Sequence, residues 1–302
     1  MPQKRIKLYV QALRLERWPR SLAIIPGFAA ILVLDKEIVK TIDVPLTLMK
    51  LCLGFLLTWF ISTANYIINE ITDAPFDAFH PAKKHRPLVN GEISRGILML
   101  IWLALVVVSF AAGYLVFNIN FMWSLLALLV AGMIYNIPPV RVKDIPILDS
   151  TIESANNPIR FLVGWYIVAS SFAPPFLLLA WWVFGNFLMV GKRVAEKKFL
   201  TEEESAGYRM SLKKYSMGML VSFMILNAVL FLVFFALFAV EANLRTFLYS
   251  IPFIVVYLVM FIKKSLQDRD GAEEPEKLLK NPYFAFYTLF LAIIFAIAYI
   301  FS

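Results

Sequence analysis

The sequence predicts an all-α polytopic membrane protein in which nine transmembrane helices are bundled around a central polar cavity. Hydrophobic residues make up 60% of its 302 positions. Its mean hydropathy is +0.73, which lies far above the range of soluble domains. Apolar runs long enough to cross a bilayer recur along the chain, and polar loops that alternate in Lys and Arg content separate them.

The nine expected segments follow from these runs. They are 21–36, 45–68, 97–118, 121–137, 145–168, 172–190, 216–239, 246–263 and 282–301. The first is the weakest, since its uninterrupted apolar run is short. Residues 1–302 are expected to form one integral membrane domain. Within it, residues 1–20 mix basic and apolar side chains, which predicts an amphipathic segment on the cytoplasmic membrane surface.

Basic residues predict the orientation. They gather in residues 1–20 and in the loops 78–96, 138–144, 191–214 and 263–280. Because cytoplasmic loops carry an excess of Lys and Arg, we expect a plasma-membrane protein with its N-terminus inside and its C-terminus outside. The net charge of +8 then indicates contacts with anionic lipid headgroups and phosphate substrates, and no nucleic-acid partner is expected. Cys52 is the one cysteine, which excludes an intramolecular disulfide.

A polar stripe at the end of the second segment is the main candidate for chemistry. Asn65, Asn69, Asp73 and Asp77 are four residues apart. On an α-helix this spacing places them on one face, about 6 Å apart along the axis. Carboxylate and amide oxygens are ligands that Mg²⁺ accepts. The stripe therefore predicts a magnesium site, with Asn69, Asp73 and Asp77 as the reactive end.

A cationic loop follows the stripe directly. Lys83, Lys84 and Arg86 lie within ten residues of Asp77. Lys and Arg neutralise phosphate oxygens, so acids and cations together predict a magnesium-bound diphosphate. The alternative is a solvated loop that only sets the membrane topology.

The segment 145–168 carries a second polar set. Glu153, Asn157 and Arg160 recur inside an apolar run, where ionised groups face a bundle interior or an aqueous cavity. They predict either a structural Glu153–Arg160 salt bridge or a cavity wall that faces the acids of the stripe.

A third polar set directly follows the segment 172–190. Lys192, Arg193 and Glu196 are expected at the cytoplasmic mouth, although such residues also flank spans that simply stop there. Tyr66 and Tyr135 fit packing or an interfacial belt better than catalysis.

The stripe and its loop resemble the first aspartate-rich motif, NDxxDxxxD, of the UbiA-type intramembrane prenyltransferase superfamily. Residues 80–87 look like an HPxKxxRP motif found in its decaprenyl-phosphate phosphoribosyltransferase branch. Residues 135–144, with Lys143, and residues 191–196 are similar to further parts of that branch. The resemblance covers most of the chain.

This resemblance implies a UbiA-like fold, a Mg²⁺ cofactor and specific site residues. Asn69, Asp73 and Asp77 would ligate the metal, with Glu70 assisting in the place of an Asp. The implied substrate contacts are Lys83, Lys84, Arg86, Tyr135, Lys143, Asn157, Arg160, Lys192, Arg193 and Glu196.

Two departures from the family pattern matter. Pro75 is expected to break the helix near Ile71, which would leave Asp77 on a loop. Lys192, Arg193 and Glu196 stand where prenyltransferases carry a second aspartate motif, and cations there suit a donor with an additional phosphate.

The expected function is a Mg²⁺-dependent membrane transferase that uses a diphosphate-bearing small-molecule donor and a polyprenyl lipid. The leading version transfers 5-phosphoribose from phosphoribosyl pyrophosphate to a polyprenyl phosphate of the decaprenyl type. A second version moves a prenyl group from its diphosphate to an aromatic or glycerol-phosphate acceptor. A third is a transporter or scaffold without turnover. A homo-oligomer is compatible with each version.

Overall fold

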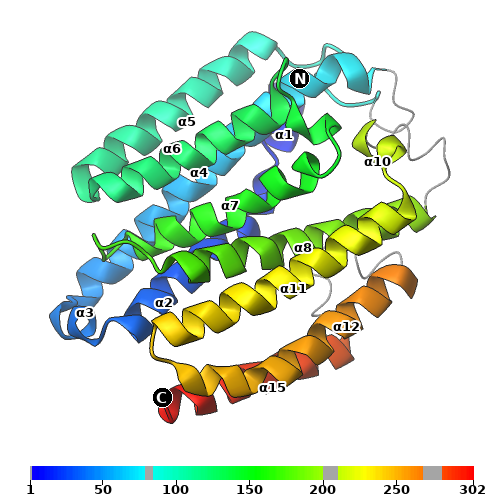
Figure 1. Cartoon of the computed structure of the whole chain (residues 1–302). Coiled ribbons are helices and arrows are strands. Elements are labelled where there is room, and N and C mark those ends of the chain that lie inside the picture. Colours follow the sequence, from blue (N-terminus) through cyan, green and yellow to red (C-terminus); the bar gives the residue numbers. More distant parts are fainter. Residues whose placement is uncertain (1, 79–83, 200–209, 268–280) are drawn as a thin grey trace. The chain divides into compact units, whose positions relative to one another are not determined.

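The chain folds into helices that form two compact units. In the computed structural model, residues 2–78, 84–199, 210–267 and 281–302 are described, and no β-strand occurs among them (Figure 1). Unit 1 comprises Met1–Lys143 and Asn156–Ala173, and unit 2 comprises Asp144–Ala155 and Pro174–Ser302. The predicted all-helical membrane fold is confirmed.

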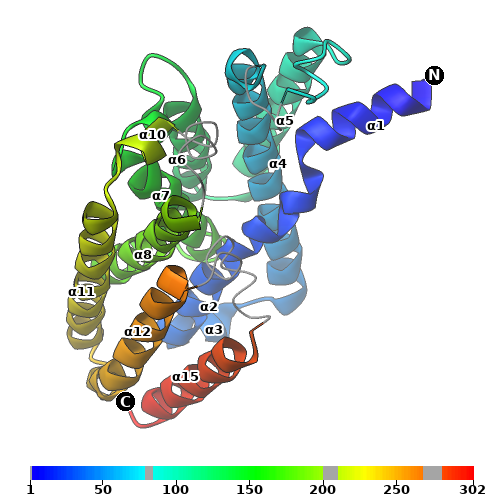
Figure 2. The same ribbon diagram turned by 90° about the vertical axis from the view of Figure 1, so that its right-hand side faces the viewer.

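Unit 1 is built around one long helix, α4 (Val44–Asp77), which packs against α5 (Arg95–Val116) and α6 (Ile119–Asn136) (Figure 1). Its other elements are α1 (Pro2–Leu13), η1 (Leu15–Ile24), α2 (Ile25–Leu34), α3 (Lys36–Thr41) and the last turns of α7 (Leu148–Trp165). The short helix η2 (Val142–Asp144) lies at the end of its first segment. Figure 2 shows α1 projecting away from α4 toward the N-terminus.

The 34 residues of α4 explain how one helix can both cross a membrane and present a polar site. At a rise of 1.5 Å per residue it is about 51 Å long, whereas a bilayer core is about 30 Å thick. Asp43 caps its first turn by accepting a hydrogen bond from the Leu46 N–H. The turns from Asn69 onward therefore extend past the length that the apolar layer requires.

The expected helix break at Pro75 is wrong. Helix α4 continues through Pro75 to Asp77, so Asp77 is helical and the four-residue spacing is kept. Proline removes the hydrogen bond to the carbonyl four residues earlier, here that of Ile71. The following turn still closes, since the Ala78 N–H donates to the Ala74 carbonyl over 3.3 Å. One lost bond within the last turns does not end the helix.

Eight described helices are long and apolar enough to cross a membrane, so the predicted count of nine is not confirmed. The difference lies in α7, which occupies the predicted segment 145–168. Asp149, Glu153 and Arg160 fall within its 18 residues and lower its hydropathy. The first of the eight covers Arg5–Leu34, so it also takes up much of the predicted surface segment.

Unit 2 consists mainly of apolar helices. Besides the first turns of α7, its helices are α8 (Pro175–Phe199), α10 (Met210–Lys214), α11 (Met217–Glu241), η3 (Arg245–Ser250), α12 (Ile251–Gln267) and α15 (Pro282–Ile300). Helix α8 packs along α11, and Gly191 lets α12 approach α8, because a Cβ there would lie 2.4 Å from the Phe261 ring.

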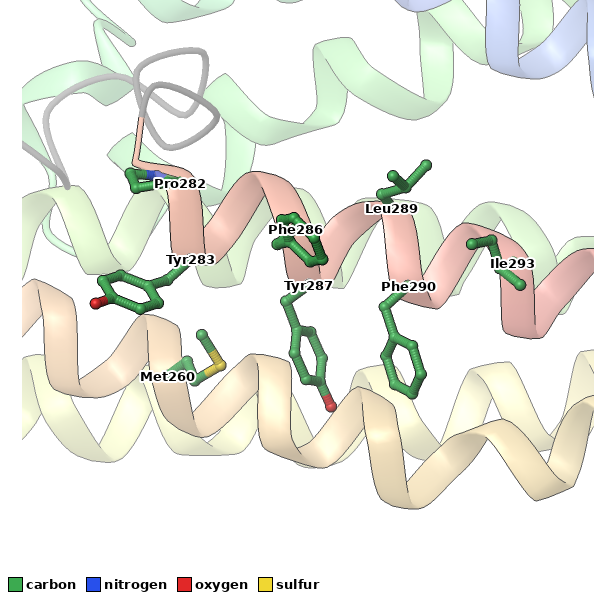
Figure 3. A pocket seen from close by; sticks show the side chains of 8 residues that line it. All are labelled: Met260, Pro282, Tyr283, Phe286, Tyr287, Leu289, Phe290 and Ile293. Carbon is green, nitrogen blue, oxygen red and sulfur yellow. The ribbon is translucent and has the colours of Figure 1, made fainter.

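An open apolar groove of about 700 Å³ runs along α12 and α15 (Figure 3). Tyr287 and Phe290 extend from α15 toward α12, where the Tyr287 hydroxyl donates to the Phe253 carbonyl over 2.9 Å (Figure 3). Its lining holds none of the predicted site residues.

Candidate active site

The polar stripe of α4 converges on one ammonium group. Lys143 Nζ donates to Asn69 Oδ1 over 3.0 Å and to Asp73 Oδ1 over 2.5 Å. A third bond of 3.0 Å runs to Asn136 Oδ1 at the end of α6. The Lys143 residue is 9% exposed. Three side-chain oxygens from two helices thus surround a single positive charge within unit 1.

Arg141 adds a second cation to Asp73. Its Nη2 lies 3.1 Å from Asp73 Oδ1, and its guanidinium stacks 4.1 Å above the Phe76 ring. A further bond of 3.3 Å reaches the Thr72 carbonyl. Sequence reasoning missed both Arg141 and Asn136 as site residues. The available signal was their position beside Lys143 in the stretch 135–144.

Asp77 and Glu70 share the guanidinium of Arg86. Arg86 Nη1 lies 2.6 Å from Asp77 Oδ2 and 3.4 Å from Glu70 Oε2. Arg14, between α1 and η1, reaches the same Glu70 oxygen over 3.2 Å. Glu70 is 4% exposed and joins the N-terminal segment to the basic loop. In this structure Glu70 and Asp77 bind guanidinium groups, and Asn69 binds the Lys143 ammonium group. Asp73 binds both that ammonium group and the Arg141 guanidinium.

The first residue of the stripe has a structural contact. Asn65 Nδ2 donates to the Leu128 carbonyl of α6 over 2.8 Å. Gly132 makes room for it, since a Cβ at Gly132 would lie 2.1 Å from Asn65 Cγ. This contact sets the crossing of α4 and α6, from which Asn136 projects toward Lys143.

The other site residues predicted for unit 1 differ in their exposure. Lys83 lies outside the described residues, Lys84 is exposed, and Tyr135 and Asn157 are half-buried. Arg160 Nη2 donates to Ser62 Oγ over 3.3 Å.

Unit 2 contains a buried network centred on Arg193. Its guanidinium donates to Asp149 Oδ2 over 3.0 Å, to Glu153 Oε2 over 2.8 Å and to Glu196 Oε2 over 3.0 Å. Arg193 is 0% exposed. Each of its three nitrogens therefore faces a carboxylate, and a phosphate could reach it only by displacing one of them.

Two hydroxyl groups complete this network. The hydroxyls of Tyr215 and Ser211 donate to Asp149, over 2.5 and 3.0 Å. Burial, together with its bond to Asp149, raises the pKa of Tyr215 far above its usual range. Tyr215 therefore remains a neutral donor at physiological pH. Lys192 Nζ lies 4.0 Å from Glu196 Oε1, at the more exposed edge of the network.

Among the described residues, neither unit presents an all-acid metal cage. Within the described ranges, no group of three His, Cys, Asp or Glu side chains is placed to hold a metal ion. The oxygens on Lys143 come from one carboxylate and two amides. A divalent ion there would rely on further oxygens from a ligand and from water.

Comparisons with known proteins identify the family of the chain. A model of the UbiA prenyltransferase family matches residues 23–290. A decaprenyl-phosphate phosphoribosyltransferase from Mycobacterium tuberculosis is 27% identical over 237 residues, which cover 76% of this chain and 75% of that protein. Its counterpart from Corynebacterium glutamicum is 26% identical over 215 residues, which cover 68% of this chain and 59% of that protein.

Solved structures share the fold. A UbiA homologue from Archaeoglobus fulgidus, bound to GPP and Mg²⁺, has a TM-score of 0.67 at 18% identity. The match covers 95% of this chain and 98% of that protein's chain. A structure of digeranylgeranylglyceryl phosphate synthase has a TM-score of 0.62 at 18% identity, over 98% of this chain and 96% of its own. With the family model matching most of its length, this chain belongs to the UbiA prenyltransferase family and is an integral membrane transferase.

Proposed function

We propose that the protein transfers 5-phosphoribose from phosphoribosyl pyrophosphate to a polyprenyl phosphate. The observation that carries this proposal is the pairing of a UbiA-type stripe with cations where prenyltransferases carry a second acidic motif. The named relatives are decaprenyl-phosphate phosphoribosyltransferases, which supports the same donor and acceptor. Family membership sets aside the non-catalytic alternative.

The stripe fits a divalent cation. Asn69, Asp73 and Asn136 already direct three oxygens at one positive charge, the ammonium of Lys143. Mg²⁺ is bound by one or two carboxylates together with phosphate and water oxygens, and this set supplies such a carboxylate. When bound, Mg²⁺ would act as a Lewis acid on the diphosphate leaving group. Asn69 and Asp73 would hold it, and Asp77 is proposed as a further ligand with Glu70 assisting.

The chain's own residues account for the rest of the reaction. Lys83, Lys84 and Arg86 would bind the diphosphate oxygens by charge-assisted hydrogen bonds. A phosphate oxygen of the lipid attacks C1 of the ribose, and the bond from C1 to the diphosphate oxygen breaks. The attacking oxygen is already anionic, so the reaction needs no general base. Asn157 and Tyr135 are proposed as substrate contacts.

The cations of α8 are assigned different tasks. We propose that Lys192, which is partly exposed, contacts substrate phosphate directly. Arg193, closed in by three carboxylates, would act as a positioning residue that holds Glu196 and the start of α7 in place. A buried ion-pair network of this kind loses much stability when one partner is removed.

A transfer assay distinguishes the two enzymatic readings. The purified protein in nanodiscs receives either ribose-labelled phosphoribosyl pyrophosphate with polyprenyl phosphate, or labelled prenyl diphosphate with an aromatic or glycerol-phosphate acceptor, each with Mg²⁺. We expect label in the lipid fraction only from the first pair. Transfer from prenyl diphosphate alone would instead establish the prenyltransferase reading, which the prenyl-diphosphate complexes of the fold neighbours favour.

The proposed orientation has its own test. In a Cys52→Ala background, Lys84→Cys and Asn243→Cys place single thiols at two exposed loop positions. With basic loops inside, an impermeant maleimide should label Lys84→Cys only from the cytoplasmic side and Asn243→Cys only from outside. The reverse pattern would contradict both the orientation and the cytoplasmic position of the active-site mouth.

A further inference from the structure

Arg14 lies at a bend in the N-terminal segment. It follows the last residue of α1 and precedes η1, and its backbone is left-handed, with φ 50° and ψ 44°. Such a conformation is uncommon for a residue that carries a side chain. At this bend the guanidinium reaches α4, where Arg14 Nη2 donates to Glu70 Oε2 over 3.2 Å. An arginine of the N-terminal segment thus contacts the acid that directly follows Asn69 of the stripe.

Helix α1 is held in place by contacts other than this ion pair. Ala12 is buried in an apolar cluster that also contains Ala74 of α4. The Tyr9 hydroxyl accepts a hydrogen bond of 2.9 Å from the Ser94 N–H, directly before α5. Helix α1 therefore contacts both α4 and the end of the loop 78–96. Because these contacts are independent of the charge of Arg14, a neutral residue there should leave the fold intact.

Glu70 is shared between Arg14 and Arg86. Arg86 Nη1 lies 3.4 Å from the same Glu70 oxygen and 2.6 Å from Asp77 Oδ2. Arg14 is thus the closer of the two to Glu70, and Arg86 lies closer to Asp77 than to Glu70. Glu70 and Asp77 are 4% and 5% exposed, so water and salt screen their charges weakly. The formal charges of these four side chains sum to zero.

The charge of Arg14 determines how strongly Arg86 can attract an anion. With a neutral residue at position 14, Glu70 and Asp77 would share the single guanidinium of Arg86. The three remaining formal charges would then sum to −1. An anion that approaches Arg86 would meet this net negative charge, which weakens its attraction. Compensation of Glu70 by Arg14 therefore keeps Arg86 attractive to phosphate oxygens.

We propose that Arg14 is a positioning residue for the diphosphate of the donor. It compensates Glu70 and thereby leaves the charge of Arg86 available to the diphosphate. The inference rests on the proposed function, in which Arg86 binds that diphosphate. Arg14 acts through Glu70 and Arg86, so its role requires no contact with the substrate.

The role predicts opposite effects on an anion and on a divalent cation. Arg14→Gln makes the surroundings of Glu70 and Asp77 more negative. Pyrophosphate should therefore bind more weakly, whereas Mn²⁺ should bind as well as before or more tightly. A loss of structure at this end of α4 would instead weaken the binding of both. The sign of the two changes thus separates an electrostatic role from a structural one.

The test measures binding without turnover to protein in nanodiscs. Calorimetry follows inorganic pyrophosphate in the absence of divalent metal, and electron paramagnetic resonance follows Mn²⁺ in the absence of pyrophosphate. Arg14→Gln is compared with Arg14→Lys, which keeps the charge, and with Arg86→Gln. The control is Arg95→Gln, which removes an exposed arginine from the start of α5. In the double variant Arg14→Gln/Glu70→Gln the acid is removed together with its partner, so the test does not depend on the folding of Arg14→Gln alone.

We expect Arg14→Gln to lower the pyrophosphate affinity about five- to thirty-fold and to leave the Mn²⁺ affinity unchanged or raised. Arg14→Lys should recover most of the pyrophosphate affinity. The double variant should bind pyrophosphate nearly as the wild type does, because the charges of Arg86 and Asp77 again sum to zero. Equal loss for both ligands, no loss for pyrophosphate, or a double variant as weak as Arg86→Gln overturns the inference.

Arg86→Gln distinguishes this inference from the proposed function. If it weakens pyrophosphate binding and Arg14→Gln does not, the inference fails and the proposed role of Arg86 stands. If Arg86→Gln has no effect, the proposed role of Arg86 fails, and the inference fails with it. Pyrophosphate binding that depends on Arg14 and Arg86 in a protein without phosphoribosyl transfer would support the inference and remove the proposed function.

Discussion

Asp73→Asn is expected to reduce Mg²⁺-dependent turnover by about a thousand-fold or more. Among the three side-chain oxygens described around Lys143, Asp73 supplies the carboxylate, so the change removes a full negative charge directed at that point. A metal that stabilises developing charge on a leaving group contributes several kcal/mol, and each 1.4 kcal/mol is a factor of about ten in rate. Label transfer at a series of Mg²⁺ concentrations measures the effect.

The fold should survive this change. Asparagine has nearly the same shape as aspartate and keeps one side-chain oxygen. Lys143 also retains its acceptors at Asn69 and Asn136. Arg141 retains its contacts with the Thr72 carbonyl and the Phe76 ring. Glu37→Gln is the matched control, since Glu37 is an exposed acid paired with Lys40 on α3. A folded Asp73→Asn protein with near wild-type activity would remove Asp73 from the metal site.

Arg193→Gln should have the largest effect on stability. Asp149, Glu153 and Glu196 would keep their charges in a buried site and lose the guanidinium that compensates them. Removing one partner of a buried ion pair typically costs about 3–5 kcal/mol. That is a large part of the stability of an ordinary domain. We expect a much lower yield of folded protein and a clearly lower Tm in detergent.

Two further variants separate this structural role from direct phosphate binding. Lys192→Gln changes a neighbouring, partly exposed cation and should leave Tm nearly unchanged, while the KM for phosphoribosyl pyrophosphate rises. Glu153→Gln introduced together with Arg193→Gln removes one of the uncompensated charges and should restore part of the lost stability. A stable Arg193→Gln protein whose only defect is a raised KM for the donor would show that Arg193 binds phosphate itself.

Local patterns in the sequence determined most of the architecture. Hydropathy and run length predicted the apolar helices, because the bilayer imposes the same length and composition on every span. Helix α7 departs from this rule, since three charged residues place it below the apolarity of the other helices. The four-residue spacing indicated one helix for Asn69, Asp73 and Asp77, whereas Pro75 predicted a break near Ile71. Helix α4 continues through Asp77, so the spacing is kept and the predicted break is wrong.

Only the tertiary structure decided which groups meet. Lys143 reaches Asp73 from 70 positions away, and Arg14 reaches Glu70 from 56 positions away. The burial of Arg193 among acids 40 and 44 positions earlier was likewise not predicted. Helical periodicity is a local property, so it places residues on a face of their own helix. The partner of each charge depends on how helices cross, and those crossings are set by close contacts such as Gly132 against Asn65 and Gly164 against Ile24, which no spacing in the sequence reveals.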